Sequence, residues 1–141
     1  EELLGSKENA RGLFYAVEDR DGGVEGFCGL RGVNQEAQFA EVFFLFLSPE
    51  MEAGEGGCEA VRFVLGQAFD RLHLAKVTIL ALDIETGLSA LLSKTGFVCE
   101  GAQRQAVYMR GGWHDVQTWT CFRGDAVVSD NLQGERHALQ D

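Results

Sequence analysis

The stretch FAEVFFLFLSPEMEAGEGGCEAVRFVLGQAFDRLHLAKVTILALD, residues 39–83, decides the fold. Its first ten residues are apolar on both faces after Glu41, which predicts a central strand buried on both sides. Residues 58–72 carry apolar side chains at helical spacing, namely Val61, Val64, Leu65, Ala68, Phe69 and Leu72. Residues 75–83 are a further strand-like run. This succession of strand, helix and strand predicts a βαβ unit.

The flanking segments add strands before this unit and a helix and a hairpin after it. Residues 12–18 and 24–33 predict two strands joined by a tight turn, because Asp21-Gly22-Gly23 supplies the positive φ that a hairpin needs. Residues 86–96 predict a short helix with Leu88, Leu91 and Leu92 as its buried stripe. Residues 97–110 and 114–124 predict a closing strand pair, and residues 1–10 the end of a helix.

The expected architecture is therefore α+β, a mixed and mostly antiparallel sheet in the order β-β-β-α-β-α-β-β. No linker or internal repeat is visible, so we expect residues 1–141 to form one domain. Its core is expected at residues 11–124. Residues 125–141 are expected to be a tail that is either loose or a short helix.

Composition narrows the function classes. Twelve basic and 22 acidic residues give a net charge of −10, which argues against a nucleic-acid binder and favours a cationic small partner. No apolar run reaches the roughly 20 residues of a membrane span, and no leader peptide is visible. The four cysteines show no metal-binding spacing, which favours reduced, mostly buried thiols in a cytoplasmic protein.

Several segments, in order, resemble the GNAT N-acetyltransferase superfamily, and most of all its ribosomal-protein N-terminal acetyltransferase branch. They are the central stretch quoted above, GFCGL (26–30), KTGF (94–97), EG (100–101) and GGWHD (111–115). The resemblance covers residues 13–123 and implies a GNAT-like sheet with helices on both faces. It also implies a strand and two helices before residue 12, which help to form the acceptor site. This chain has at most the last turn of one of these helices. A partner subunit, a missing segment or an open acceptor site must account for the difference, and a partner subunit would make the protein a homodimer.

The resemblance also implies a site for acetyl-CoA. In that fold the central strand and the next one splay apart, and their free backbone groups bind the pantetheine arm; here the splayed edge would be Phe46, Leu47 and Ser48. The pyrophosphate would lie on the loop Glu52–Cys58 at a helix N-terminus, where free N–H groups and the helix dipole attract anions.

This chain departs from the family in both cofactor motifs. Aligned without gaps, the positions of the basic residue and the two small residues hold Glu52, Glu55 and Gly57; a slip of one residue gives Ala53, Gly54 and Gly56. Glu85 stands where the family has a second cofactor contact, an asparagine. These carboxylates would weaken the binding of a polyanionic cofactor. Cys58 begins the helix, and its backbone closes the predicted phosphate loop.

Two side chains are candidates for the chemistry. Glu41 heads the splayed strand and could act as base or substrate anchor, or it could be a solvated strand-end carboxylate. Tyr108 could donate a proton to the departing thiolate, although a strand tyrosine is more often a packing residue. The chain is thus either an acetyl-CoA-dependent N-acetyltransferase acting on a small-molecule or peptide amine, or a GNAT fold repurposed as a non-catalytic binding module.

Overall fold

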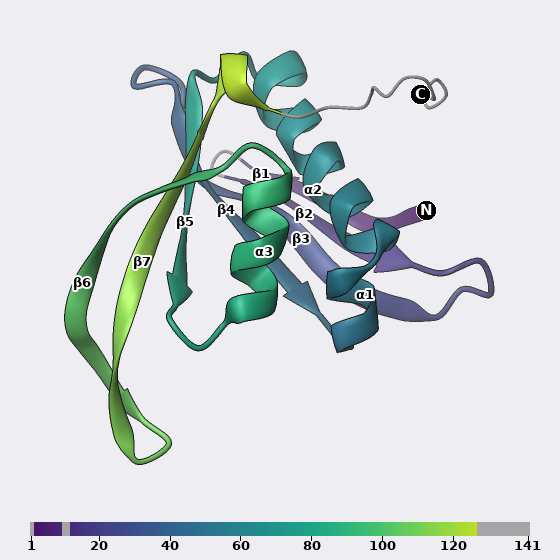
Figure 1. The fold of residues 1–141 in the computed structure, drawn as a ribbon. Coiled ribbons are helices and arrows are strands. Elements are labelled where there is room, and N and C mark those ends of the chain that lie inside the picture. Colours follow the sequence, from purple (N-terminus) through teal and green to yellow (C-terminus); the bar gives the residue numbers. More distant parts are fainter. Residues whose placement is uncertain (1, 10–11, 127–141) are drawn as a thin grey trace.

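The computed structural model describes residues 2–9 and 12–126, which form a seven-stranded sheet with helices packed on it (Figure 1). The strand order is β1-β2-β3-β4-β5-β7-β6, and β4 and β5 are the parallel pair among antiparallel neighbours. The strands are β1 (Glu2–Asn9), β2 (Gly12–Glu18), β3 (Val24–Asn34), β4 (Phe39–Phe46), β5 (Lys76–Leu82), β6 (Val98–Met109) and β7 (Gly112–Phe122).

The helices of the described residues lie where the sequence predicts them, apart from a 3₁₀ turn and one added α-helix. They are α1 (Pro49–Ala53), α2 (Glu55–Gly66), which continues into a π-helical turn (Gln67–Arg71), α3 (Thr86–Lys94) and a 3₁₀ turn (Arg123–Asp125). The added element is α1. The hydroxyl of Ser48 accepts a hydrogen bond from the Met51 N–H at 3.1 Å, and Pro49 follows at the first helical position. The predicted α+β class and element order are confirmed.

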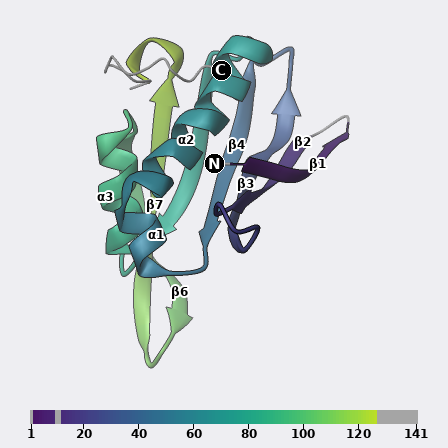
Figure 2. The ribbon, with the colours of Figure 1, turned by 90° about the vertical axis from the view of Figure 1, so that its right-hand side faces the viewer.

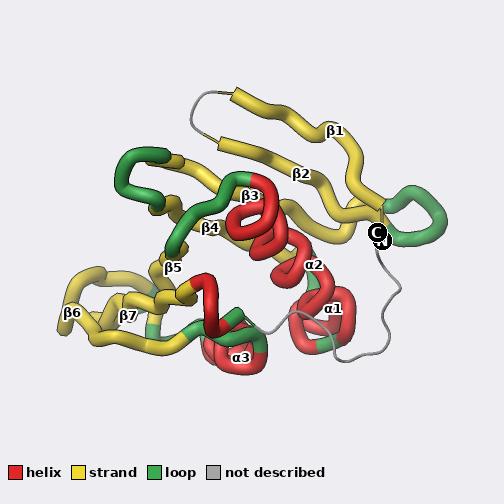
Figure 3. Tube along the Cα trace, turned by 90° about the horizontal axis from the view of Figure 1, so that it is seen from above, coloured by secondary structure: helices red, strands yellow, loops and turns green. Residues whose placement is uncertain are grey.

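The helices α1, α2 and α3 lie over one face of the curved sheet (Figures 2 and 3). In the part of the chain that the structure describes, the prediction of helices on both faces is therefore wrong. The prediction that residues 39–48 are buried on both sides is also wrong. Ala40 and Val42 are buried beneath the helices, whereas Leu45, on the opposite face, is 56% exposed. We call this helix-free side of the sheet the open face.

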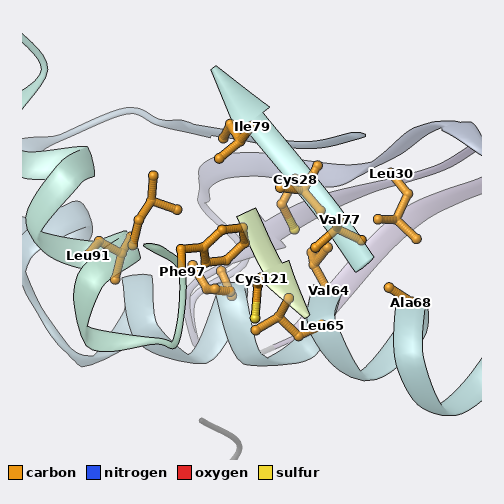
Figure 4. Close-up of a cluster of buried hydrophobic side chains, with 14 of the residues drawn as sticks. Cys28, Leu30, Val64, Leu65, Ala68, Val77, Ile79, Leu91, Phe97 and Cys121 are labelled. Carbon is orange, nitrogen blue, oxygen red and sulfur yellow. The ribbon is translucent and has the colours of Figure 1, made fainter. Parts of the chain in front are cut away.

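The core fills the space between the sheet and the helices (Figure 4). Alternate residues of β4 and β5 contribute Val42, Val77 and Ile79, because successive side chains of a strand point to opposite faces. The predicted apolar stripes on α2 and α3 are buried, with only Leu72 partly exposed. The thiols of Cys28, Cys58 and Cys121 are buried, and burial raises the pKa of Cys121 to about 12. This agrees with the expectation of mostly buried thiols.

The N-terminal segment differs from its prediction. Residues 1–10 were predicted to end a helix, but Glu2–Asn9 forms β1, which pairs antiparallel with β2 from Glu2↔Glu18 to Asn9↔Gly12. A run that contains several helix-forming residues thus adopts an edge strand, because pairing with β2 overrides local helix propensity. The predicted tail falls mostly on residues 127–141, outside the described residues.

Candidate functional site

The sheet opens between β4 and β5. The two strands pair only through Phe39↔Lys76, Ala40↔Val77 and Glu41↔Thr78, although β4 continues to Phe46 and β5 to Leu82. Beyond Glu41, β4 follows β3, and β5 follows β7, so the two strands diverge (Figure 1). The facing edges then have backbone N–H and C=O groups with no neighbouring strand to bond. This is the splay that the resemblance implies, with Glu41 at its vertex.

The chain leaving the splayed end of β4 enters two consecutive helices instead of an open loop. Glu52 and Ala53 belong to α1, residues from Glu55 onward belong to α2, and Gly54 alone separates the helices. The Gly54 N–H donates to the Glu50 carbonyl at 3.0 Å. The first turn of α2 receives no side-chain cap from the described residues, and the N–H groups of such a turn are the ones that bind anions at helix N-termini in general.

Gly57 has a packing role in this segment. A Cβ at Gly57 would lie 2.6 Å from the Glu52 carbonyl oxygen and 2.9 Å from that of Met51. The backbones of α1 and α2 can therefore touch only where a side chain is absent. This contact fixes the position of the α2 N-terminus relative to β4.

Glu52 points from α1 to the N-terminus of α3. Its carboxylate lies so close to Gly87 that a Cβ there would collide with it. Burial, and next the negative charge of Glu85, raise the pKa of Glu52. The two carboxylates predicted from separate motifs thus lie close enough to interact. Glu85 also accepts a hydrogen bond from the Leu82 N–H at 2.8 Å, which holds its carboxylate against the end of β5.

Arg62 is a charged residue of this region that the sequence reasoning did not assign to the site. Its Nη1 lies 3.3 Å from Oε2 of Glu55, so it places a guanidinium close to the first turn of α2. The available signal was spacing, because residues seven apart lie on the same side of a helix. Arg62 therefore offsets one of the carboxylates that oppose anion binding.

The other predicted cofactor residues have mixed surroundings. Phe46 is partly buried and stacks on Phe44, with ring centroids 6.2 Å apart, whereas Leu47 is 57% exposed. Ser48 uses its hydroxyl to cap α1, and the Cys58 side chain is in the core. The Leu47 N–H already donates to the Glu25 carbonyl at 3.0 Å, and burial gives the Cys58 thiol no access to a ligand.

Glu41 projects from the vertex onto the open face. Its Oε1 lies 3.2 Å from Nε of Arg31, the residue opposite it on β3, and both side chains are substantially exposed. Thr78 on β5 is its partner on the other side. Glu41 is therefore a carboxylate beside the point where the sheet opens, accessible from the open face.

Tyr108 does not join Glu41. Tyr108 pairs with Trp113 near the end of the β6–β7 hairpin, and the two rings pack edge to face with centroids 5.4 Å apart. Thr78 pairs with Thr120, which is seven positions from Trp113 along β7. At about 3.3 Å per residue, the separation along the sheet is roughly 23 Å. The structure therefore does not bring Tyr108 and Glu41 together, and the exposed Tyr108 ring lies near the end of the β6–β7 hairpin.

A polar cluster fixes the base of this hairpin. Asp83, just after β5, accepts hydrogen bonds from the Asp115 N–H and interacts with Nδ1 of His114, each at 3.0 Å. The hydrogen bond from the Asp115 N–H is the main cause of the lowered pKa of Asp83. Asp115 in turn accepts from the Gln105 N–H at 2.9 Å, where β6 bulges. Asp115 therefore binds a backbone N–H group of the neighbouring strand and helps to fix the hairpin.

Comparison with known proteins identifies the family. The model for the "Acetyltransferase (GNAT) domain" matches residues 2–98. The chain belongs to the GNAT acetyltransferase family. The family is one of N-acetyltransferases, and it uses acetyl-CoA.

The similar proteins cover most of the chain. "Probable N-acetyltransferase YjcK" of Bacillus subtilis (strain 168) is 32% identical over 127 residues, 89% of this chain and 67% of the relative. "Putative ribosomal N-acetyltransferase YdaF" of the same organism is 28% identical over 79% of this chain and 58% of its own length. The chain thus spans about three fifths to two thirds of these relatives.

A solved structure of spermidine N-acetyltransferase from Vibrio cholerae, in complex with CoA and spermine, has a similar fold. The TM-score is 0.74 with 21% identity, over 82% of this chain and 68% of the other. This GNAT chain has no helix among its described residues that is long and apolar enough to cross a membrane.

Proposed function

We propose that this GNAT protein binds acetyl-CoA between β4 and β5 and transfers the acetyl group to a primary amine that approaches from the open face. The observation that carries the proposal is the splay, because both strands continue for several residues after their pairing ends at Glu41↔Thr78. The unpaired edges suit the amide-rich pantetheine arm of the cofactor, which can hydrogen-bond to backbone groups.

The α2 N-terminus suits the pyrophosphate. Backbone N–H groups of Glu55, Gly56 and Gly57 would hold the phosphate oxygens, and the helix dipole favours negative charge there. Arg62 adds a positive charge nearby, whereas Glu52 and Glu85 oppose binding. The backbone therefore fits the cofactor and the carboxylates reduce its affinity.

Acetyl-CoA, when bound, supplies a thioester carbonyl that an amine nitrogen attacks, so that a C–N bond forms and the C–S bond to CoA breaks. Glu41 would bind the incoming ammonium and take one proton from it on a carboxylate oxygen, which frees the nitrogen lone pair. The second amine proton leaves to solvent or to the departing thiolate. The β4 backbone and the vertex would hold the two reactants together.

The test is acetyl transfer followed by mass spectrometry, with acetyl-CoA and a panel of primary amines and short peptides. We expect Glu41→Gln to lower kcat by about 10²-fold or more, as removal of a general base does, with acetyl-CoA affinity unchanged. Glu36→Gln is the matched control, because Glu36 is an exposed glutamate in the turn before β4. Equal turnover by the Glu41 and Glu36 variants would refute the role of Glu41.

The second candidate function is a GNAT fold that no longer transfers acetyl groups and serves as a binding module. The observation that favours it is the Glu52 carboxylate, which lies against the N-terminus of α3 and interacts with Glu85. If the folded protein binds no acetyl-CoA at millimolar concentration, this second function replaces the first.

A further inference from the structure

We propose that the Arg31 side chain occupies the position of the acceptor's ammonium group and that the acceptor, a primary amine with an apolar body, displaces it. This inference rests on the proposed function, because it identifies the acceptor position with the Glu41 side of the splay. It goes beyond that function by naming the occupant of the free site and the class of amine.

The cation position is built from two strands of the open face. The Arg31 guanidinium touches Glu41 through Nε at 3.2 Å, and its Cζ lies 5.4 Å from the centre of the Phe43 ring. The Phe43 ring also packs against the Phe14 ring, with the two centroids 5.6 Å apart. Gly29 lies between these residues in the sheet, and a Cβ at Gly29 would lie 3.1 Å from the Phe43 ring. A carboxylate and a supported aromatic face are together a binding site for a cation.

The contacts of the Arg31 guanidinium are weak enough for another cation to displace it. Its side chain is 58% exposed and that of Glu41 is 41% exposed, so solvent screens the ion pair. An exposed ion pair and an exposed cation–π contact each contribute only modestly to stability. A substrate ammonium can therefore take the place of the guanidinium on Glu41 without disturbing the fold.

The surroundings of this position favour an apolar amine over a polycation. Leu45 on β4 and Leu80 on β5 lie beyond the vertex, each 56% exposed, and by strand alternation both lie on the face of Glu41. They border the splay from its two sides. The body of a bound amine would cover these two apolar side chains, which favours an apolar body at this position.

Lys76 is a second cation on the open face and provides a control. Its Nζ lies 5.7 Å from the ring centre of Phe39 and 5.9 Å from that of Phe122, on the paired side of the vertex. It therefore contributes positive charge without occupying the Glu41 position. Replacing it tests for a general electrostatic effect.

The experiment measures binding of 4-fluorobenzylamine to the 141-residue chain by ¹⁹F NMR, with and without acetyl-CoA. We expect Arg31→Met to strengthen binding by about three- to tenfold, Lys76→Met to change it less than twofold, and Glu41→Gln to weaken it. Putrescine, a diamine without an apolar ring, is expected to compete poorly. In transfer assays Arg31→Met lowers KM for the amine and leaves kcat and the acetyl-CoA affinity unchanged.

The outcomes separate the two proposals. The inference is overturned if Arg31→Met leaves amine binding unchanged or weakens it, or if Lys76→Met strengthens binding as much as Arg31→Met does. It is also overturned if Arg31→Met lowers kcat without strengthening amine binding, because Arg31 would then be a positioning residue for Glu41. Stronger amine binding in Arg31→Met without any acetyl transfer would uphold the cation position and refute the proposed function.

Discussion

Neutralising Glu52 should strengthen acetyl-CoA binding. The Glu52 carboxylate lies between α1 and the N-terminus of α3, next to the proposed phosphate position, and Glu85 adds to the negative charge there. A unit charge within about 10 Å of a phosphate, at an effective dielectric constant of about 20 to 40, costs about 1 kcal/mol. Glu52→Gln keeps the size of the side chain and removes that cost, so the dissociation constant should fall about fivefold.

Isothermal titration with acetyl-CoA measures this effect, and Glu36→Gln serves as the matched control at the opposite end of β4. The gain should be larger at about 0.01 M salt than at 0.15 M, because screening shortens the reach of the charge. It should also shrink as the pH falls, since the raised pKa of Glu52 means that its carboxylate takes up a proton before an ordinary glutamate does. An affinity equal to that of the unmodified protein at neutral pH and low salt would refute the charge argument.

Two further predictions concern stability. Gly57→Ala should lower the free energy of unfolding by about 1 to 2 kcal/mol and the Tm by several degrees, because the clash of the alanine Cβ with the α1 backbone costs more than the helix propensity of alanine contributes. Thermal unfolding followed by circular dichroism measures this. A Gly57→Ala variant at least as stable as the unmodified protein contradicts it. Because the folded-state pKa of Asp83 is lowered, its contribution to stability exists above the ordinary aspartate pKa and is lost as the pH falls through the lowered value. Asp83→Asn should therefore be less stable than the unmodified protein at pH 7, with the difference shrinking in acid, and a difference that stays constant with pH would count against the argument.

The sequence predicted the elements whose patterns are long and regular. The stripe on α2 and the leucines of α3 repeat at helical spacing, and Asp19 with Gly22 forms the turn that the DGG motif indicated, with Gly22 at φ 87°. The helix α1 was missed because its five residues are too few for periodicity, although Ser48 and Pro49 are start signals for a helix.

Other errors arose where the sequence pattern does not report what covers a surface. The apolar run of β4 looks the same whether a second layer lies over Leu45 or not, so burial on both sides could not be distinguished from an open face. The sequence pattern also does not predict the distances between residues on different strands or helices. The separation of Tyr108 from Glu41 depends on the register of β7, and the contact of Glu52 with Gly87 depends on how α1 packs beside α3.

The most direct test of the proposed cofactor position is the change in backbone amide NMR signals on adding acetyl-CoA to the folded chain. The account predicts saturable shifts in the splayed part of β4, residues 42–46, and in the first turn of α2, residues 55–57, with little change at the tip of the β6–β7 hairpin. Shifts confined to that hairpin, or no shifts at millimolar acetyl-CoA, would contradict it.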